Sequence, residues 1–132
     1  MGGRGANSGG KYGRAPRGYR TVGKVHGIPV IKSIDSGGKI LPIAAKPNSQ
    51  YLGMNKFGTV KQLRVYDENG NVRKDIDWSH PFEGHRSGTV HCHEWHGLSR
   101  TMTHSRLTKS EISKYREAIE EASGRKDLIW TW

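Results

Sequence analysis

Residues 60–78 read VKQLRVYDENGNVRKDIDW, and this stretch decides the fold that the sequence predicts. Two runs of strand-like composition, 60–66 and 72–78, flank the turn sequence DENGN. Asn-Gly between such runs is a strong hairpin signal, because both residues tolerate a positive φ. Side chains alternate across a strand, so Asp75 and Asp77 should share one face. The opposite face should then carry Val72, Lys74, Ile76 and Trp78.

Further strands are expected on both sides of this hairpin. Residues 21–34 are rich in β-branched side chains, and His26-Gly27 could form a turn between two short strands. Residues 40–44 are a possible edge strand, since Pro42 lacks a backbone donor. Residues 46–56 are expected to form a loop, and residues 89–95 a third strand of the meander.

One helix is expected near the C-terminus. Thr108 and Glu111 have the spacing of a capping box, and Ser123-Gly124 is a suitable end. An apolar stripe at helical spacing lies between them: Ile112, Tyr115, Ile119 and Ala122. Residues 128–132 alternate and are expected to dock as a strand. The fold class predicted is therefore α+β: an antiparallel β-meander with one C-terminal helix, stapled by a bound metal.

Composition bounds the organisation of the chain. Its 132 residues suit one domain, and a hydrophobic content of 33% gives a modest core that a metal would help to stabilise. Residues 1–20 are predicted to be a flexible basic Gly/Arg-rich arm, and residues 21–132 a single domain. A single cysteine, no leader-like apolar region and no apolar run of membrane-spanning length favour a cytoplasmic protein without a membrane partner.

The positive charge is unevenly placed. The net charge is +10, and residues 1–66 hold 12 Lys and Arg against one acidic residue, Asp35. Such a field attracts nucleic acid or the acidic face of a protein that handles it. The N-terminal arm is either the contact surface or a plain tail. The residues expected to bind nucleic acid or a partner are Arg4, Lys11, Arg14, Arg17, Arg20 and Lys24.

Six of the seven histidines lie within the 25 residues 80–104, directly after the two aspartates of the hairpin. His91-Cys92-His93 lies in the expected third strand, so both histidines can point to one spot, while Cys92 should face the core. Imidazole is a common ligand for zinc. We therefore expect a structural zinc site within residues 75–96.

The preferred ligands come from the second hairpin strand, the following loop and the third strand: Asp77, His80, His91 and His93. The site depends on the strand register, because a slip of one residue would turn the aspartate face of one strand away from the histidine face of the next. The alternative ligands are Asp75, His85 and His96. Trp78 and Trp95 should pack around the site.

A catalytic role is the alternative to a structural zinc site. A structural zinc site has all four positions filled by protein, whereas a catalytic site keeps one for water. Without metal, His and Asp could act as an acid–base pair in phosphodiester cleavage. Arg73, Arg86 and Arg100 could then hold the phosphate. The spacing of the residues does not separate these cases.

Two stretches carry a resemblance. Residues 1–10 are similar to the G-G-R-G-rich start of many small prophage proteins. Residues 64–95, with the order Y-D-x-x-G, K-D-I-D-W, H and H-x-H-x-W, resemble a module of phage and mobile-element proteins that also ends some polymorphic toxins. By size, charge and origin, the chain also looks like phage anti-CRISPR inhibitors.

Three functions are expected from the residues together with this resemblance. The first is a phage-encoded zinc protein that blocks nucleic acid loading of a host effector nuclease by non-catalytic binding. The second is a metal- or His-dependent nuclease of the toxin type. The third is an accessory protein of the phage head module.

Overall fold

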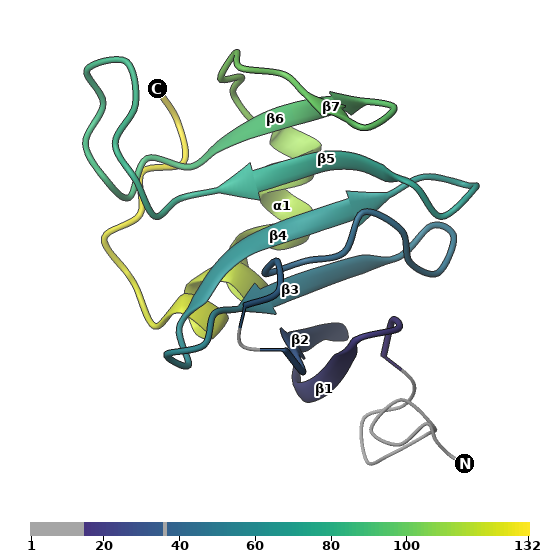
Figure 1. The fold of residues 1–132 in the computed structure, drawn as a ribbon. Helices are drawn as coiled ribbons and strands as arrows, with labels where there is room; N and C mark the ends of the chain where they lie inside the picture. Colours follow the sequence, from purple (N-terminus) through teal and green to yellow (C-terminus); the bar gives the residue numbers. More distant parts are fainter. Residues whose placement is uncertain (1–14, 36) are drawn as a thin grey trace.

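The computed structural model describes residues 15–35 and 37–132, which form one sheet and one helix (Figure 1). The seven strands lie in sequence order across the sheet. The α+β class and the C-terminal helix are as predicted. The elements are β1 (Tyr19–Val25), β2 (Ile28–Ser33), β3 (Gln50–Met54), β4 (Val60–Tyr66), β5 (Val72–Asp77), β6 (His91–His96), β7 (Ser99–Arg100) and α1 (Lys109–Ser123).

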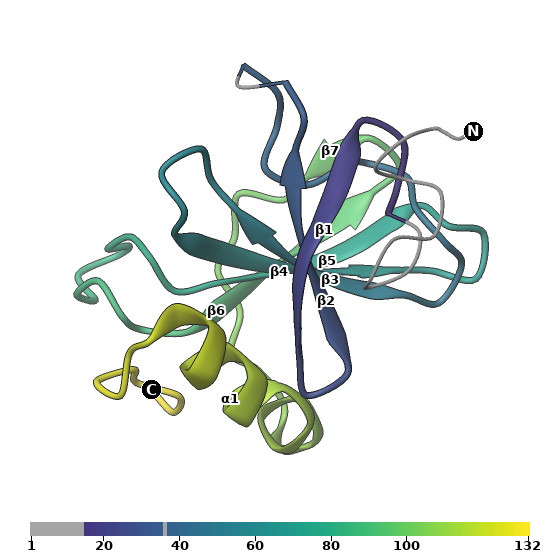
Figure 2. The same cartoon turned by 90° about the horizontal axis from the view of Figure 1, so that it is seen from below.

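All neighbouring strands are antiparallel except β2 and β3. A parallel pair needs a crossover, and residues 34–49 supply it. This segment lies over the face of the sheet opposite α1 (Figures 1 and 2). Arg64 Nη1 anchors it by donating hydrogen bonds to the carbonyl oxygens of Leu41 and Pro42 at 3.2 and 3.1 Å.

The expected hairpin is β4–β5. Asp67 Oδ1 accepts hydrogen bonds from the backbone N–H groups of Asn69 and Asn71 at 2.8 and 2.9 Å, and Gly70 has a φ of 81°. A bulge pairs Tyr66 with Val72. It turns Val72 into the cluster on the face opposite α1, so our prediction that Val72 shares the face of Ile76 was wrong.

The main core lies between the sheet and α1. Leu52, Leu63, Ile76 and Ile119 are fully buried there. The capping box of Thr108 and Glu111 is present, and Gly124 ends the helix in the left-handed conformation, as predicted. No helix within residues 15–35 and 37–132 has the length and apolar character that crossing a bilayer requires.

Some expected elements differ. Residues 50–54, predicted as loop, form β3, and Gly53 leaves room there for the crossover, since a Cβ would meet Leu41 Cγ at 2.7 Å. Residues 40–44, predicted as a strand, make only the single bridge of Ala44 with Asn71. The C-terminal tail docks through one bridge between Ile129 and Thr89 rather than as a strand.

The N-terminal boundary also differs. β1 begins at Tyr19, which is buried, so the boundary expected at residue 20 falls inside a strand. Ala15 is buried as well, in the same cluster as Tyr19. Residues 1–14, the greater part of the expected arm, lie outside the described residues.

Candidate metal centre

The register of β5 and β6 brings the aspartates and histidines to one face. Asp77 pairs with His91 and Asp75 pairs with His93 in the antiparallel ladder. Cys92 pairs with Ile76 on the other face and is buried in the core beneath α1. The alignment of the acidic and imidazole faces, on which the predicted site depended, is therefore present.

Four histidines converge at this face: His80, His91, His93 and His104. One ring nitrogen of each lies within 4.8 Å of the corresponding nitrogen of every other. Tetrahedral zinc with bonds of about 2.0–2.1 Å requires its ligand nitrogens to lie roughly 3.4 Å apart. Small side-chain shifts bring the cluster to that spacing, so it can hold a metal ion.

The hydrogen bonds of two histidines define their tautomers. His91 Nδ1 lies 2.9 Å from the carbonyl oxygen of Thr89, and His93 Nδ1 lies 3.0 Å from that of Thr101. A carbonyl oxygen only accepts, so each Nδ1 carries the proton and each Nε2 keeps its lone pair. This arrangement orients a histidine that binds metal.

Three ring nitrogens of the cluster are buried without a hydrogen-bond partner among the described residues: His91 Nε2, His93 Nε2 and His104 Nδ1. A buried polar atom without a partner costs about 1–3 kcal/mol. His104 Nδ1 also lies 3.4 Å from Glu83 Oε1, so the two β6 nitrogens carry the argument: their missing partner fits a cation held by the cluster.

Burial keeps the imidazoles of His91 and His93 neutral. Desolvation lowers the pKa of His91 to about 4, and it also lowers the pKa of His93 from its ordinary value. A metal ligand must present an unprotonated nitrogen. Both β6 histidines therefore meet this requirement at neutral pH.

An aromatic side chain covers the cluster. Phe82 is 6% exposed, stacks on His104 at 4.5 Å between ring centroids, and lies 4.1 Å from His91. Trp132 contacts Phe82 and His85, with centroid distances of 5.2 and 4.7 Å. The loop between β5 and β6 and the C-terminal tail thus shield the site from water.

The two aspartates lie beside the cluster and are engaged by other groups. Asp77 Oδ2 is 3.7 Å from His93 Nε2, but it pairs with Arg100, and Asp77 Oδ1 accepts from Gln62 Nε2 at 2.9 Å. Asp75 is fully buried and accepts from Arg64 Nε and Nη2 at 2.6 and 3.0 Å. It also accepts from the indole Nε1 of Trp95 at 2.9 Å.

Three of the four predicted ligands, His80, His91 and His93, therefore gather with one another. Asp77 lies next to them, and His104 occupies the place that the sequence assigned to a carboxylate. Of the alternative ligands, Asp75 is held by Arg64, and His85 packs against aromatic rings. His96 is exposed beyond the cluster.

His104 is the member of the histidine cluster that the sequence prediction missed. It lies eleven residues after His93, outside any strand, and the turn between β6 and β7 reverses the chain to bring it back. The signal available was its membership of the dense histidine run. Its spacing alone gave no reason to prefer it.

The predicted basic residues fall into two groups. Arg17, Arg20 and Lys24 are exposed, on or beside β1. The remaining three, Arg4, Lys11 and Arg14, lie outside the described residues.

No model of a protein family, no curated protein and no solved structure matched this chain. Its chemistry is therefore argued from its own residues.

Proposed function

We propose that this chain is a small zinc-binding protein that acts by binding, without catalysis, on a nucleic-acid-processing effector of a bacterial host cell. One observation carries the metal: one ring nitrogen from each of four histidines lies within 4.8 Å of the others, and His91 Nε2 and His93 Nε2 are buried without a hydrogen-bond partner among the described residues. The tautomers of His91 and His93 support it independently.

The ligand type favours zinc. Four imidazoles suit a borderline cation with tetrahedral coordination, and hard cations such as Mg²⁺ and Ca²⁺ prefer oxygen. Four protein ligands leave no position for water, which favours a structural ion. The ion would link β6 to the loop that carries His80 and to the segment that carries His104.

The effector part of the proposal rests on charge and resemblance. The strongly basic half of the chain attracts nucleic acid, or the acidic face of a protein that handles it. The prophage-like start and the resemblance to phage modules favour a phage-encoded inhibitor of the anti-CRISPR kind, acting in the bacterial cytoplasm by blocking nucleic acid loading.

Native mass spectrometry before and after chelation tests the metal. We expect one zinc per chain in freshly purified protein and loss of that mass after treatment with a strong chelator. His91→Ala should abolish it, whereas His96→Ala, which removes an exposed histidine outside the cluster, should not. Protein that carries no metal and is not stabilised by added zinc would contradict the proposal.

A nuclease is the second candidate, favoured by one observation. His80 is partly exposed, and Arg100, whose side chain is 36% exposed, lies on the same face beside Asp77. An exchangeable His80 would open a metal position near a phosphate-binding guanidinium. Cleavage of plasmid or total RNA that EDTA stops and His91→Ala abolishes would establish it. Intact substrates with zinc, manganese and magnesium would exclude it.

A further inference from the structure

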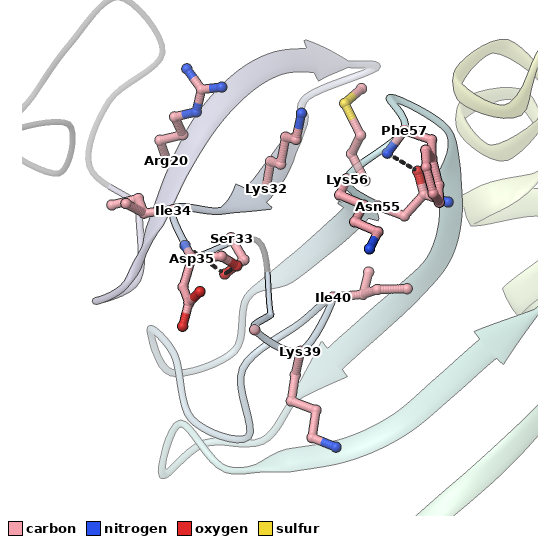
Figure 3. A pocket seen from close by; sticks show the side chains of 12 residues that line it. Arg20, Lys32, Ser33, Ile34, Asp35, Lys39, Ile40, Asn55, Lys56 and Phe57 are labelled. Atoms are coloured by element: carbon pink, nitrogen blue, oxygen red, sulfur yellow. Dashed lines mark hydrogen bonds between the residues drawn. The ribbon is translucent and has the colours of Figure 1, made fainter.

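A cleft of about 830 Å³ lies at the opposite end of the sheet from the metal centre. We call it the basic cleft. Figure 3 shows Arg20 and Lys32, from β1 and β2, on one side, and Asn55, Lys56 and Phe57, from the β3–β4 turn, on the other. Its volume falls in the range of roughly 300–1,000 Å³ that accommodates small ligands.

The cleft is strongly positive. Arg20, Lys32, Lys39 and Lys56 line it, and none of them forms an ion pair within residues 15–35 and 37–132. The residues outside this part, 1–14 and 36, contain no Asp or Glu. Asp35 is the one acidic residue among those that line the cleft. Four cations along the cleft against one carboxylate are complementary to a polyanion.

An aromatic ring stands at the rim. Phe57 is 80% exposed, which is unusual for a side chain of its size. The turn that presents it is well ordered by its own hydrogen bonds. Asn55 Oδ1 accepts from the backbone N–H groups of Phe57 and Thr59 at 2.9 and 3.0 Å. These bonds fix the backbone that presents the ring beside the cations, and Lys56 Nζ lies 5.3 Å from the ring centroid.

We propose that the basic cleft binds single-stranded nucleic acid. Lys32, Lys56 and Arg20 contact the phosphates, and a base stacks on Phe57. Cations that follow the backbone, together with an aromatic platform, are how proteins hold single strands without sequence preference. A base in a duplex has no free face for Phe57, so the arrangement selects the single strand. This inference rests on the proposed function for its biological setting, but it does not depend on the metal.

Fluorescence anisotropy with the zinc-loaded chain tests it. The probes are a labelled oligo-dT, a labelled oligo-U of the same length, and a duplex containing the same labelled strand. We expect either single strand to bind more tightly than the duplex, and the tighter of the two identifies DNA or RNA as the natural ligand. For single strands, affinity should fall with log salt at about 0.7 per phosphate contacted.

Variants locate the binding. Phe57→Ala should weaken single-strand affinity between about 5-fold and 150-fold, the effect of losing one stacked base. The double variant Lys32→Ala, Lys56→Ala should weaken it further and reduce the salt slope by about 1.4, since two phosphate contacts are lost. The matched controls remove an exposed apolar side chain and two lysines elsewhere: Leu98→Ala and the pair Lys109→Ala, Lys126→Ala.

Equal losses in the cleft and control variants would mean that net charge alone attracts the probe, and would overturn the inference. A preference for the duplex, or no binding at low salt, would also overturn it. Metal content is measured for every variant, so the two proposals fail separately. A metal-free protein whose binding depends on Phe57 contradicts the zinc proposal only. A zinc-loaded protein without single-strand binding contradicts the cleft only.

Discussion

His91 lies directly opposite Asp77 in the antiparallel β5–β6 pair. His91 is fully buried, and its Nε2 has no hydrogen-bond partner among the described residues. The carboxylate of Asp77 instead accepts from Gln62 and Arg100. The pairing thus places an unsatisfied imidazole beside a neutralised carboxylate. In the proposed metal centre, His91 is therefore a ligand and Asp77 a neighbour that supports the site.

The fourth ligand can be tested with His104→Ala and Asp77→Asn. We expect His104→Ala to abolish tight zinc binding, because it removes one of four ligands. Asp77→Asn should weaken zinc affinity by about 10–100-fold, the effect of altering a neighbour of the ligands. Competition with a zinc chelator measures both. If Asp77→Asn releases the metal while His104→Ala keeps it, the ligand set is Asp77, His80, His91 and His93.

The ion pair of Arg64 and Asp75 should dominate the stability of the face opposite α1. Arg64 is 7% exposed and Asp75 is fully buried. Arg64→Met removes the guanidinium that neutralises most of the charge on the buried Asp75 carboxylate. We therefore expect the free energy of unfolding to fall by about 3 kcal/mol. Urea denaturation measures the change. Arg73→Met, an exposed arginine on β5, serves as the control and should change stability by no more than about 0.5 kcal/mol.

Glu111 should contribute a pH-dependent part of the stability. Burial opposes its ionisation, but hydrogen bonds from Lys74 and Thr108 hold the pKa of its carboxyl below its ordinary value of 4.5. The folded state therefore favours the carboxylate. This contribution is complete above pH 4.5 and is lost as the pH falls through the lower pKa of the folded state.

Glu111→Gln tests that contribution. At pH 7 we expect it to lower the free energy of unfolding by about 1 kcal/mol, because it weakens the link between β5 and α1. The difference from the original chain should shrink as the pH is lowered below 4.5, measured by urea denaturation at each pH. Glu117→Gln, an exposed position on the same helix, is the control. A difference that stays constant with pH would contradict the assignment.

Cys92 reports on the integrity of β6. Burial raises the pKa of its thiol to about 11, so little thiolate exists at pH 8. We expect no alkylation by iodoacetamide in the zinc-loaded protein and complete alkylation in guanidinium. Chelation should speed up the reaction, because the ion links β6 to its neighbours. Equal rates with and without chelator would show that the metal does not stabilise this strand.

Local patterns were enough to predict the β4–β5 hairpin and α1. The Asn-Gly turn, the capping box and the final Gly124 act through hydrogen bonds within a few residues, so their signals survive without knowledge of the fold. β3 was missed for the opposite reason. Its five residues include Gly53 and become a strand through pairing with β4 on one side and, on the other, with β2, which the long crossover separates from it in sequence.

The candidate site was likewise predictable from the sequence only in part. His91 and His93 share a face because strand geometry has a period of two, and that could be read from the chain alone. The choice of His104 beside them, and the engagement of Asp77 by Arg100, depend on how separate segments pack against β6. No spacing rule reports such contacts, because they arise only when the turn after β6, the loop before it and the crossover settle on one sheet.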